Sequence, residues 1–351
     1  MTIREEFEKR ERNFMSPYGC LSAKSRGRSV AEDSCPVRTA FQLDRDRIVY
    51  SNAFRRLKHK TQVFLSPLGD DYRTRLTHTL EVSQMARAMA RALFLNEDLV
   101  EAIALGHDLG HTPFGHSGET VLKQIFSPDF SHSEQSLRVI DVLENNGKGL
   151  NLTYEVRDGI LKHSKGYGQI IPENPQELAS TYEGQIVRIA DIMAYLNHDL
   201  EDAIRSAVIQ AEQVPQDCAR ILGRSHSQRA TTMIRDLISS SRVGETGLHL
   251  QISDDVHGAM NLLRKFLYDN VYRSPQVHKD FEKAKKILSE LYHYFLDNKA
   301  MRDKKLSDLY ISGGNNQRQP SERIVCDLIA SMTDRYAMNL YKNIFFPIAD
   351  V

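Results

Sequence analysis

Residues 107–119 read HDLGHTPFGHSGE and form the densest cluster of histidines and carboxylates in the chain. His107 and Asp108 end an apolar stretch with helical spacing, and Gly110 and Pro113 then force the backbone to change direction. A helix end followed by such a turn can aim several side chains at one point. The segment therefore predicts a helical fold with a chemical site at a helix terminus.

Helical periodicity extends outward from this segment in both directions. Between residues 79 and 94, apolar side chains recur every three or four positions, and Asn96 suits the N-cap of the helix that follows. Further helices are expected at 117–126, 133–146, 153–164, 182–209, 227–239, 254–270, 279–297 and 320–346, and polar, glycine-rich loops at 16–34, 165–175 and 312–320. Only residues 248–252 suggest a strand, so the predicted class is all-α.

Composition narrows the class of protein. The 351 residues include 46 basic and 46 acidic side chains, a balance that argues against a protein that coats nucleic acid. The four cysteines form no CxxC pair, which indicates reduced thiols in a cytosolic protein. The charged N-terminus lacks the apolar core of a signal peptide, and no apolar run approaches the ~20 residues of a membrane helix. We therefore expect a cytoplasmic protein with no membrane segment.

Residues distant from the central segment complete a candidate metal site. His78 starts its own helix, and Asp191, Tyr195 and Asp199 share one helix face because they are spaced by four. The four candidate ligands are His78, His107, Asp108 and Asp191. Two imidazoles and two carboxylates suit Mn²⁺, Fe²⁺, Ni²⁺ or Zn²⁺ and tolerate Mg²⁺. Such an ion would polarise a phosphoryl group and lower the pKa of a bound water.

On these motifs the chain resembles the HD superfamily of metal-dependent phosphohydrolases, and within it the dNTP triphosphohydrolases, or dGTPase-like proteins. The matching segments are residues 25–28, 54–57, 60–64, 73–78, 107–119, 132–138, 197–199, 270–272 and 332–336. The resemblance implies an N-terminal arm plus a helical HD catalytic domain in residues 1–213. A C-terminal helical region, residues 214–351, is expected to pack on the HD core.

The activity implied by this resemblance is hydrolysis of a dNTP, dGTP by default, to deoxynucleoside and inorganic triphosphate. It implies one divalent metal ion per subunit (Mn, Mg, Ni, Fe or Zn). His116, oriented by Glu119, resembles the group that positions or deprotonates water. His132 resembles the group that protonates the departing 5′ oxygen, and the assignment of base and acid between the two histidines stays open. Acid–base help of this kind is typically worth about 10²–10⁴ in rate.

Substrate-binding residues are also carried over from the family. Arg75 matches a phosphate-contacting arginine, and His111 contacts phosphate or orients its loop. Gln62 and Asp199 correspond to residues that hydrogen-bond the 3′ hydroxyl, and Tyr195 to a ring packed where a 2′ hydroxyl would collide. The basic residues Arg55, Lys58 and Lys60 are either further phosphate contacts or part of a solvated helix face.

Two other functions compete with this interpretation. An HD-type phosphomonoesterase or phosphodiesterase would keep the metal ligands without needing Gln62, Arg75, Tyr195 or Asp199. A nucleic-acid-binding or regulatory protein would predict a degraded ligand set and a basic face. The family implies a homo-oligomer, from dimer to hexamer, and weak single-stranded DNA binding is compatible with it. Isolated histidines such as His163 are interpreted as surface or core residues, although the segment around His163 also matches the family.

Overall fold

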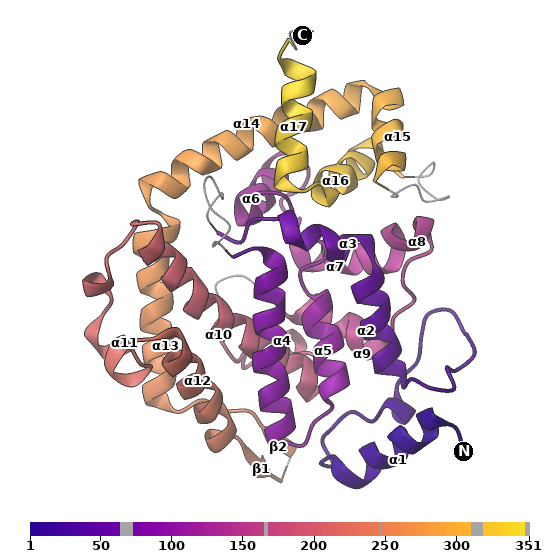
Figure 1. The fold of residues 1–351 in the computed structure, drawn as a ribbon, viewed down its shortest axis with the longest axis vertical. Coiled ribbons are helices and arrows are strands. Elements are labelled where there is room, and N and C mark those ends of the chain that lie inside the picture. The colour runs from indigo at the N-terminus through magenta and orange to yellow at the C-terminus, as the bar shows by residue number, and fades with distance from the viewer. Residues whose placement is uncertain (64–72, 165–167, 246, 310–318, 348–351) are drawn as a thin grey trace. The chain divides into compact units, whose positions relative to one another are not determined.

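The computed structural model describes residues 1–63, 73–164, 168–245, 247–309 and 319–347 (Figure 1). Helices dominate these ranges, and the predicted all-α class is confirmed. Within them the only sheet is an antiparallel pair, β1 (Arg242–Gly244) with β2 (Gly247–His249). β2 overlaps the predicted strand at its first two residues, whereas β1 was not predicted. None of the described helices has the length and apolar character needed to cross a bilayer.

The chain folds into two compact units, each assembled from three separate stretches. Unit 1 comprises residues 1–48, 78–107 and 152–274, and unit 2 comprises residues 49–77, 108–151 and 275–351. The expected division between residues 213 and 214 falls inside the last stretch of unit 1, so the compact units follow a different partition. This partition depends on packing between helices that are far apart in sequence. Such packing cannot be inferred from amino-acid composition.

Unit 1 is organised around the long helix α10, which packs against α5, α9, α12 and α13 (Figure 1). Helix α10 forms because its apolar side chains face these neighbours, with Ile186, Met193 and Leu200 almost fully buried. The elements that lie in unit 1 or start there are α1 (Ile3–Phe14), α2 (Ala40–Tyr50), α5 (Glu97–Gly106), α9 (Tyr154–Lys162), α10 (Tyr182–Arg205), α11 (Gln216–Ile221), α12 (His226–Ser240), α13 (Asp254–Leu267) and the two strands. Helix α4 (Arg75–Ala92) begins in unit 2 and continues from His78 in unit 1.

Unit 2 is organised around α14, which packs against α6, α16 and α17. Leu288 and Phe295 of α14 and Leu122 of α6 are fully buried, so apolar packing joins these helices. The helices of unit 2 are α3 (Asn52–Arg56), α6 (Gly115–Ile125), α7 (His132–Arg138), α8 (Glu144–Gly147), α14 (Pro275–Asp297), α15 (Lys299–Asp308), α16 (Ser321–Ser331) and α17 (Asp334–Phe345).

The structure corrects several helix predictions. The single helix expected at 320–346 is divided into α16 and α17, because Met332 is extended and the Thr333 side chain caps α17 by accepting from the Tyr336 amide. The helix expected at 133–146 becomes π-helical over residues 139–143 and ends where Asn145 and Asn146 are left-handed. Helix α1 was not predicted, although the Thr2–Glu5 capping box marks its start. Most of the expected loop at 312–320, and residues 165–167 of the expected loop at 165–175, lie outside the described residues.

Candidate active site

Three of the four predicted metal ligands converge inside unit 1. His78 projects from α4, His107 is the C-cap residue of α5, and Asp191 lies on α10. The Nε2 atom of His78 is 3.2 Å from Asp191 Oδ1 and 3.3 Å from His107 Nε2. Both imidazoles are almost completely buried. Three helices that are distant in sequence therefore present three metal-binding atoms to one another.

Hydrogen bonds on the far side of each ring fix which nitrogen is available. The Nδ1 atom of His107 is 2.6 Å from the Ala104 carbonyl oxygen, which can only accept, so Nδ1 carries the proton. The Nδ1 atom of His78 is 2.8 Å from Nε2 of His198, whose own Nδ1 is 2.7 Å from Asp199. In the tautomer in which His78 Nδ1 donates to His198 Nε2, the lone pair of His78 lies on Nε2. In this tautomer His78 and His107 each present an Nε2 lone pair to the other imidazole, and that of His78 also faces Asp191.

This donor set fits a divalent cation. Burial alone would raise the pKa of Asp191, but the adjacent His78 imidazole, together with those of His107 and His163, holds that pKa below its usual value, so the carboxylate is ionised. The Nε2 lone pairs of His78 and His107, 3.3 Å apart, and the Asp191 carboxylate oxygen repel one another. A cation that these three atoms coordinate would remove this repulsion. The residues present therefore suit Mn²⁺, Fe²⁺, Ni²⁺ or Zn²⁺.

A fourth side chain of unit 1, which was not among the predicted site residues, lies beside this cluster. Metal-binding atoms of His107, His163 and Asp191 all lie within 4.8 Å of one another. His163 is buried at the C-cap of α9. His163 lies directly after a helix, as His107 does. This shared position is the sequence feature that could have identified it.

The remaining predicted ligand, Asp108, forms a buried ion pair in unit 2. Asp108 Oδ2 accepts a hydrogen bond from Arg75 Nη1 across 2.6 Å, and both side chains are nearly inaccessible to solvent. Arg75 was predicted to contact phosphate, and the structure places it beside a predicted metal ligand. Its guanidinium compensates the charge of Asp108, as any buried carboxylate requires.

The three predicted catalytic residues meet in unit 2. Glu119 Oε2 is 3.0 Å from His132 Nδ1 and 3.3 Å from His116 Nδ1. Burial alone would raise the pKa of Glu119, but these two hydrogen bonds and the histidine charges hold it well below its usual value. Burial would also lower the pKa of His132, yet the bond and charge of Glu119 outweigh this and raise it. His132 is buried, whereas His116 is exposed.

Two predicted substrate-binding side chains of unit 2 carry buried polar atoms that the protein does not satisfy. Among the described residues, neither ring nitrogen of His111 has a hydrogen-bond partner, and the same holds for Gln62 Oε1. Burial, together with Arg75 and His132, lowers the pKa of His111 well below its ordinary value, so the ring is neutral. Buried atoms of this kind are rare and indicate a ligand or water that completes them.

The loop that carries these groups is held from several directions. Phe114 and Gly115 are both left-handed, with φ of 63° and 60°, and the Phe114 amide donates to Asp334 across 2.8 Å. The Gly110 amide donates to Ser136 Oγ across 2.9 Å. Lys60, one of the candidate phosphate contacts, is buried and donates instead to the carbonyl oxygens of His111 and Ala330. Its position supports the loop.

The two predicted sugar contacts of α10 belong to unit 1. Burial raises the pKa of Tyr195, so its hydroxyl is protonated. Asp199 Oδ2 accepts a hydrogen bond from the Tyr272 hydroxyl across 2.6 Å. Tyr272 lies in the matching segment 270–272, from which the resemblance implied no site residue. Asp199 therefore already interacts with Tyr272 and His198 in this structure.

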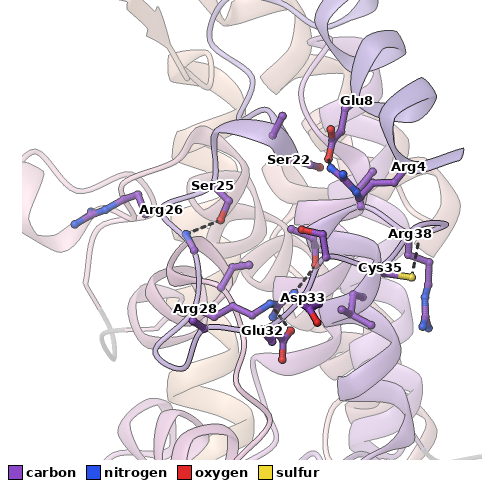
Figure 2. A pocket seen from close by; sticks show the side chains of 18 residues that line it. Arg4, Glu8, Ser22, Ser25, Arg26, Arg28, Glu32, Asp33, Cys35 and Arg38 are labelled. Carbon is purple, nitrogen blue, oxygen red and sulfur yellow. Dashed lines mark hydrogen bonds and ion pairs between the residues drawn. The ribbon is translucent and has the colours of Figure 1, made fainter. Parts of the chain in front are cut away.

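A cavity of about 420 Å³ in unit 1 is separate from the predicted residues, since none of them lines it. Figure 2 shows Arg4, Arg26, Arg28 and Arg38 around this cavity. The arginine charges are engaged, because Arg4 pairs with Glu8 at 2.5 Å, Arg28 with Glu32 at 2.8 Å, and Arg38 with Asp46 at 2.7 Å. The guanidinium of Arg26 stacks 3.6 Å above the Tyr154 ring. The cavity is thus lined by compensated charges.

Comparison with known proteins places this arrangement in a family. The HD domain model matches residues 75–196, and a phosphohydrolase-associated domain model matches residues 250–343. A deoxyguanosinetriphosphate triphosphohydrolase-like protein of Desulfatibacillum aliphaticivorans is 62% identical over 99% of both chains. The chain belongs to the deoxyguanosinetriphosphate triphosphohydrolase-like family of HD-domain proteins. This confirms the family to which the sequence motifs pointed.

Other members of the dGTPase-like family match over a similar extent. A protein of the same description from Caldanaerobacter subterraneus subsp. tengcongensis is 52% identical over 99% of this chain and 97% of its own. A solved structure of a hypothetical protein from Aquifex aeolicus matches with a TM-score of 0.45 and 20% identity, over 86% of this chain and 71% of that one. The HD match spans all four predicted ligands.

Proposed function

We propose that the protein hydrolyses dNTPs to deoxynucleoside and inorganic triphosphate, with dGTP as the default substrate, in a reaction that depends on a divalent metal ion. The convergence of His78, His107 and Asp191 in the region that the HD model matches carries this proposal. Names of curated relatives supply the substrate class. The matched ranges also support a catalytic region up to residue 213 and a C-terminal region from residue 214.

His78, His107, Asp108 and Asp191 would hold the ion. His107 and Asp108 are consecutive residues, so their Cα atoms are about 3.8 Å apart. When bound, a divalent ion supplies a Lewis acid for the α-phosphoryl group and lowers the pKa of bound water. The Ala104 carbonyl fixes the tautomer of His107 with its lone pair on Nε2, and donation from His78 Nδ1 to His198 Nε2 would make the Nε2 lone pair of His78 available as well.

The Glu119–His132–His116 group provides the proton transfers. Water attacks the α-phosphorus, a P–O bond forms, and the bond between phosphorus and the 5′ oxygen breaks. Both histidines have Nδ1 beside the Glu119 carboxylate, so each presents Nε2 for chemistry. The raised pKa of His132 makes it the acid that protonates the departing 5′ oxygen, and exposed His116 is then the group that orients the incoming water.

Binding of the nucleotide would satisfy the atoms that the protein leaves without partners. Gln62 Oε1 suits a donor such as the 3′ hydroxyl. The neutral His111 ring suits a phosphate oxygen through its N–H. Tyr195, protonated and partly buried, would pack on the sugar and collide with a 2′ hydroxyl. This role of Tyr195 predicts discrimination against ribonucleotides.

A product assay tests the proposal. The full chain, stripped by a chelator and reloaded with Mn²⁺, is incubated with each of the four dNTPs, with their mixture, and with the four rNTPs in ¹⁸O-water. We expect deoxynucleoside and inorganic triphosphate in equal amounts, with ¹⁸O only in the triphosphate, and slower turnover of rNTPs. Release of orthophosphate or pyrophosphate, or full activity without metal, would overturn the proposal and favour another phosphoesterase.

Variants separate the metal site from the proton-transfer group. Asp108→Ala is expected to lose Mn²⁺ binding and turnover together. Glu119→Ala should keep the metal and lower kcat by about 10²–10⁴. Glu212→Ala removes an exposed carboxylate and is the matched control.

A further inference from the structure

His163 is a buried imidazole whose orientation is fixed by the end of its own helix. It is the C-cap residue of α9 and only 2% of its surface is exposed. Its Nδ1 atom lies 2.7 Å from the carbonyl oxygen of Ile160, three residues earlier. A carbonyl oxygen only accepts, so Nδ1 carries a proton and Nε2 is the ring nitrogen left to bind a metal.

The surroundings of His163 match those of the ligand cluster. Its metal-binding nitrogen lies within 4.8 Å of those of His107 and Asp191. Its ring centroid is 4.9 Å from that of His107, at an interplanar angle of 72°. Asp191 is in turn 3.2 Å from His78. Within unit 1, His107 and Asp191 therefore each lie beside both His78 and His163.

His163 and His107 are held in the same way. Each follows a helix directly, and each donates Nδ1–H to the carbonyl oxygen three residues earlier, at 2.7 Å and 2.6 Å. Histidines that bind metals almost always donate their other ring proton to a carbonyl or carboxylate, which fixes the tautomer. A purely structural role for His163 would be fulfilled by the Ile160 bond alone and would not require Nε2 near Asp191.

We propose that His163 is a further ligand, through Nε2, of the divalent ion that His78, His107, Asp108 and Asp191 hold. The inference rests on the proposed metal site and extends it. A fifth protein ligand would leave fewer positions on the ion for water or a substrate oxygen. Three imidazoles also move the preference of the site away from Mg²⁺ and toward Mn²⁺, Fe²⁺, Ni²⁺ or Zn²⁺.

Replacement of His163 by Asn is the sharpest variant. The Asn amide can retain the hydrogen bond to the Ile160 carbonyl, because its nitrogen occupies a position similar to Nδ1, but it has no atom at the position of Nε2. Free Mn²⁺ is measured by electron paramagnetic resonance, and the water molecules bound to the ion are counted by spin-echo modulation. We expect Mn²⁺ binding to weaken about tenfold or more and one additional water to bind. His257→Asn, an exposed histidine on α13, should change neither value.

A measurement on the unaltered protein avoids dependence on folding of the variant. X-ray absorption of the Zn²⁺-loaded chain reports the number of imidazoles around the ion, and three are expected. Two imidazoles, or unchanged affinity and water number in His163→Asn, would overturn the role of His163 while leaving the proposed function intact. Failure of the unaltered chain to bind Mn²⁺ or Zn²⁺ would instead refute the proposed metal site itself.

Discussion

Arg75 and Asp108 form a buried ion pair in which the guanidinium Nη1 lies 2.6 Å from the carboxylate Oδ2. The negative charge of Asp108, a predicted metal ligand, is thus already balanced by the positive charge of Arg75. Because the positive charge of Arg75 and a divalent ion both favour ionised Asp108, the state of this pair affects stability as well as metal binding.

Arg75→Ala should therefore destabilise the metal-free protein and increase its dependence on metal. Breaking a buried pair leaves one charge uncompensated, which costs about 3–5 kcal/mol. We expect this loss of unfolding free energy without metal, and a larger increase in Tm on adding Mn²⁺ than in the unaltered protein. Denaturant titration and thermal scans with and without Mn²⁺ measure both values. An equal Mn²⁺-induced increase in the two proteins would show that Asp108 does not contribute to the ion.

Glu119→Gln should change the pH dependence of kcat. Glu119 raises the pKa of His132 despite its burial, so removing the negative charge lowers that pKa. A reaction that needs protonated His132 keeps its rate below this pKa and loses it as pH rises through it. The alkaline decline in kcat should therefore begin at a lower pH in Glu119→Gln. A decline at the same or a higher pH would contradict the role of His132 as the acid.

Lys60→Met should remove a pH dependence of stability. Burial lowers the pKa of Lys60 to about 7, whereas an unfolded lysine has a pKa of about 10.4. Between these values the unfolded chain binds more protons, so unfolding free energy rises with pH, by at most about 1.4 kcal/mol per unit. Denaturant titrations at successive pH values should give a flatter slope for Lys60→Met. The exposed neighbour Lys58→Met should keep the original slope.

Gly110→Ala should disturb the loop between Asp108 and His111. A Cβ atom at Gly110 would lie 2.1 Å from the Ser136 amide nitrogen and 2.3 Å from the Gln135 carbonyl carbon, so backbone has to move. We expect a loss of about 1–3 kcal/mol or more in unfolding free energy, with reduced turnover. Gly258→Ala is the matched control on α13, where a Cβ meets nothing within 4 Å and should stabilise the helix by up to about 1 kcal/mol. Equal stability of the two variants would contradict this packing.

Apolar spacing and N-cap residues predicted most helices, because both features lie within the segment that forms the helix. Helices α5 and α10 follow from apolar spacing, and the Asn96 side chain caps α5 by accepting from the Asp98 and Leu99 amides. The division between α16 and α17 was missed because apolar spacing continues across Met332 and outweighed the Thr333 cap signal. The partition into two discontinuous units could not be predicted, since it depends on packing between stretches separated by many residues.

The candidate site was predicted through motifs more than through geometry. Asp191 lies beside His78 only because α4 and α10 bring them together, and spacing alone does not contain this distance. His163 was interpreted as an ordinary histidine because a single imidazole has no local pattern of its own. The Ile160 bond and the proximity to Asp191 become visible only when the helices are assembled. Engagement of Arg75 by Asp108 is likewise a property of the folded chain.

Helices α5 and α9 end at His107 and His163, so two helix C-termini lie beside the same group of side chains. Each terminus is equivalent to roughly half a negative elementary charge, which arises from aligned peptide units. The backbone thereby adds to the preference of this group for a positive charge, independently of which side chains are present. Selection of one metal over another is left to the side chains.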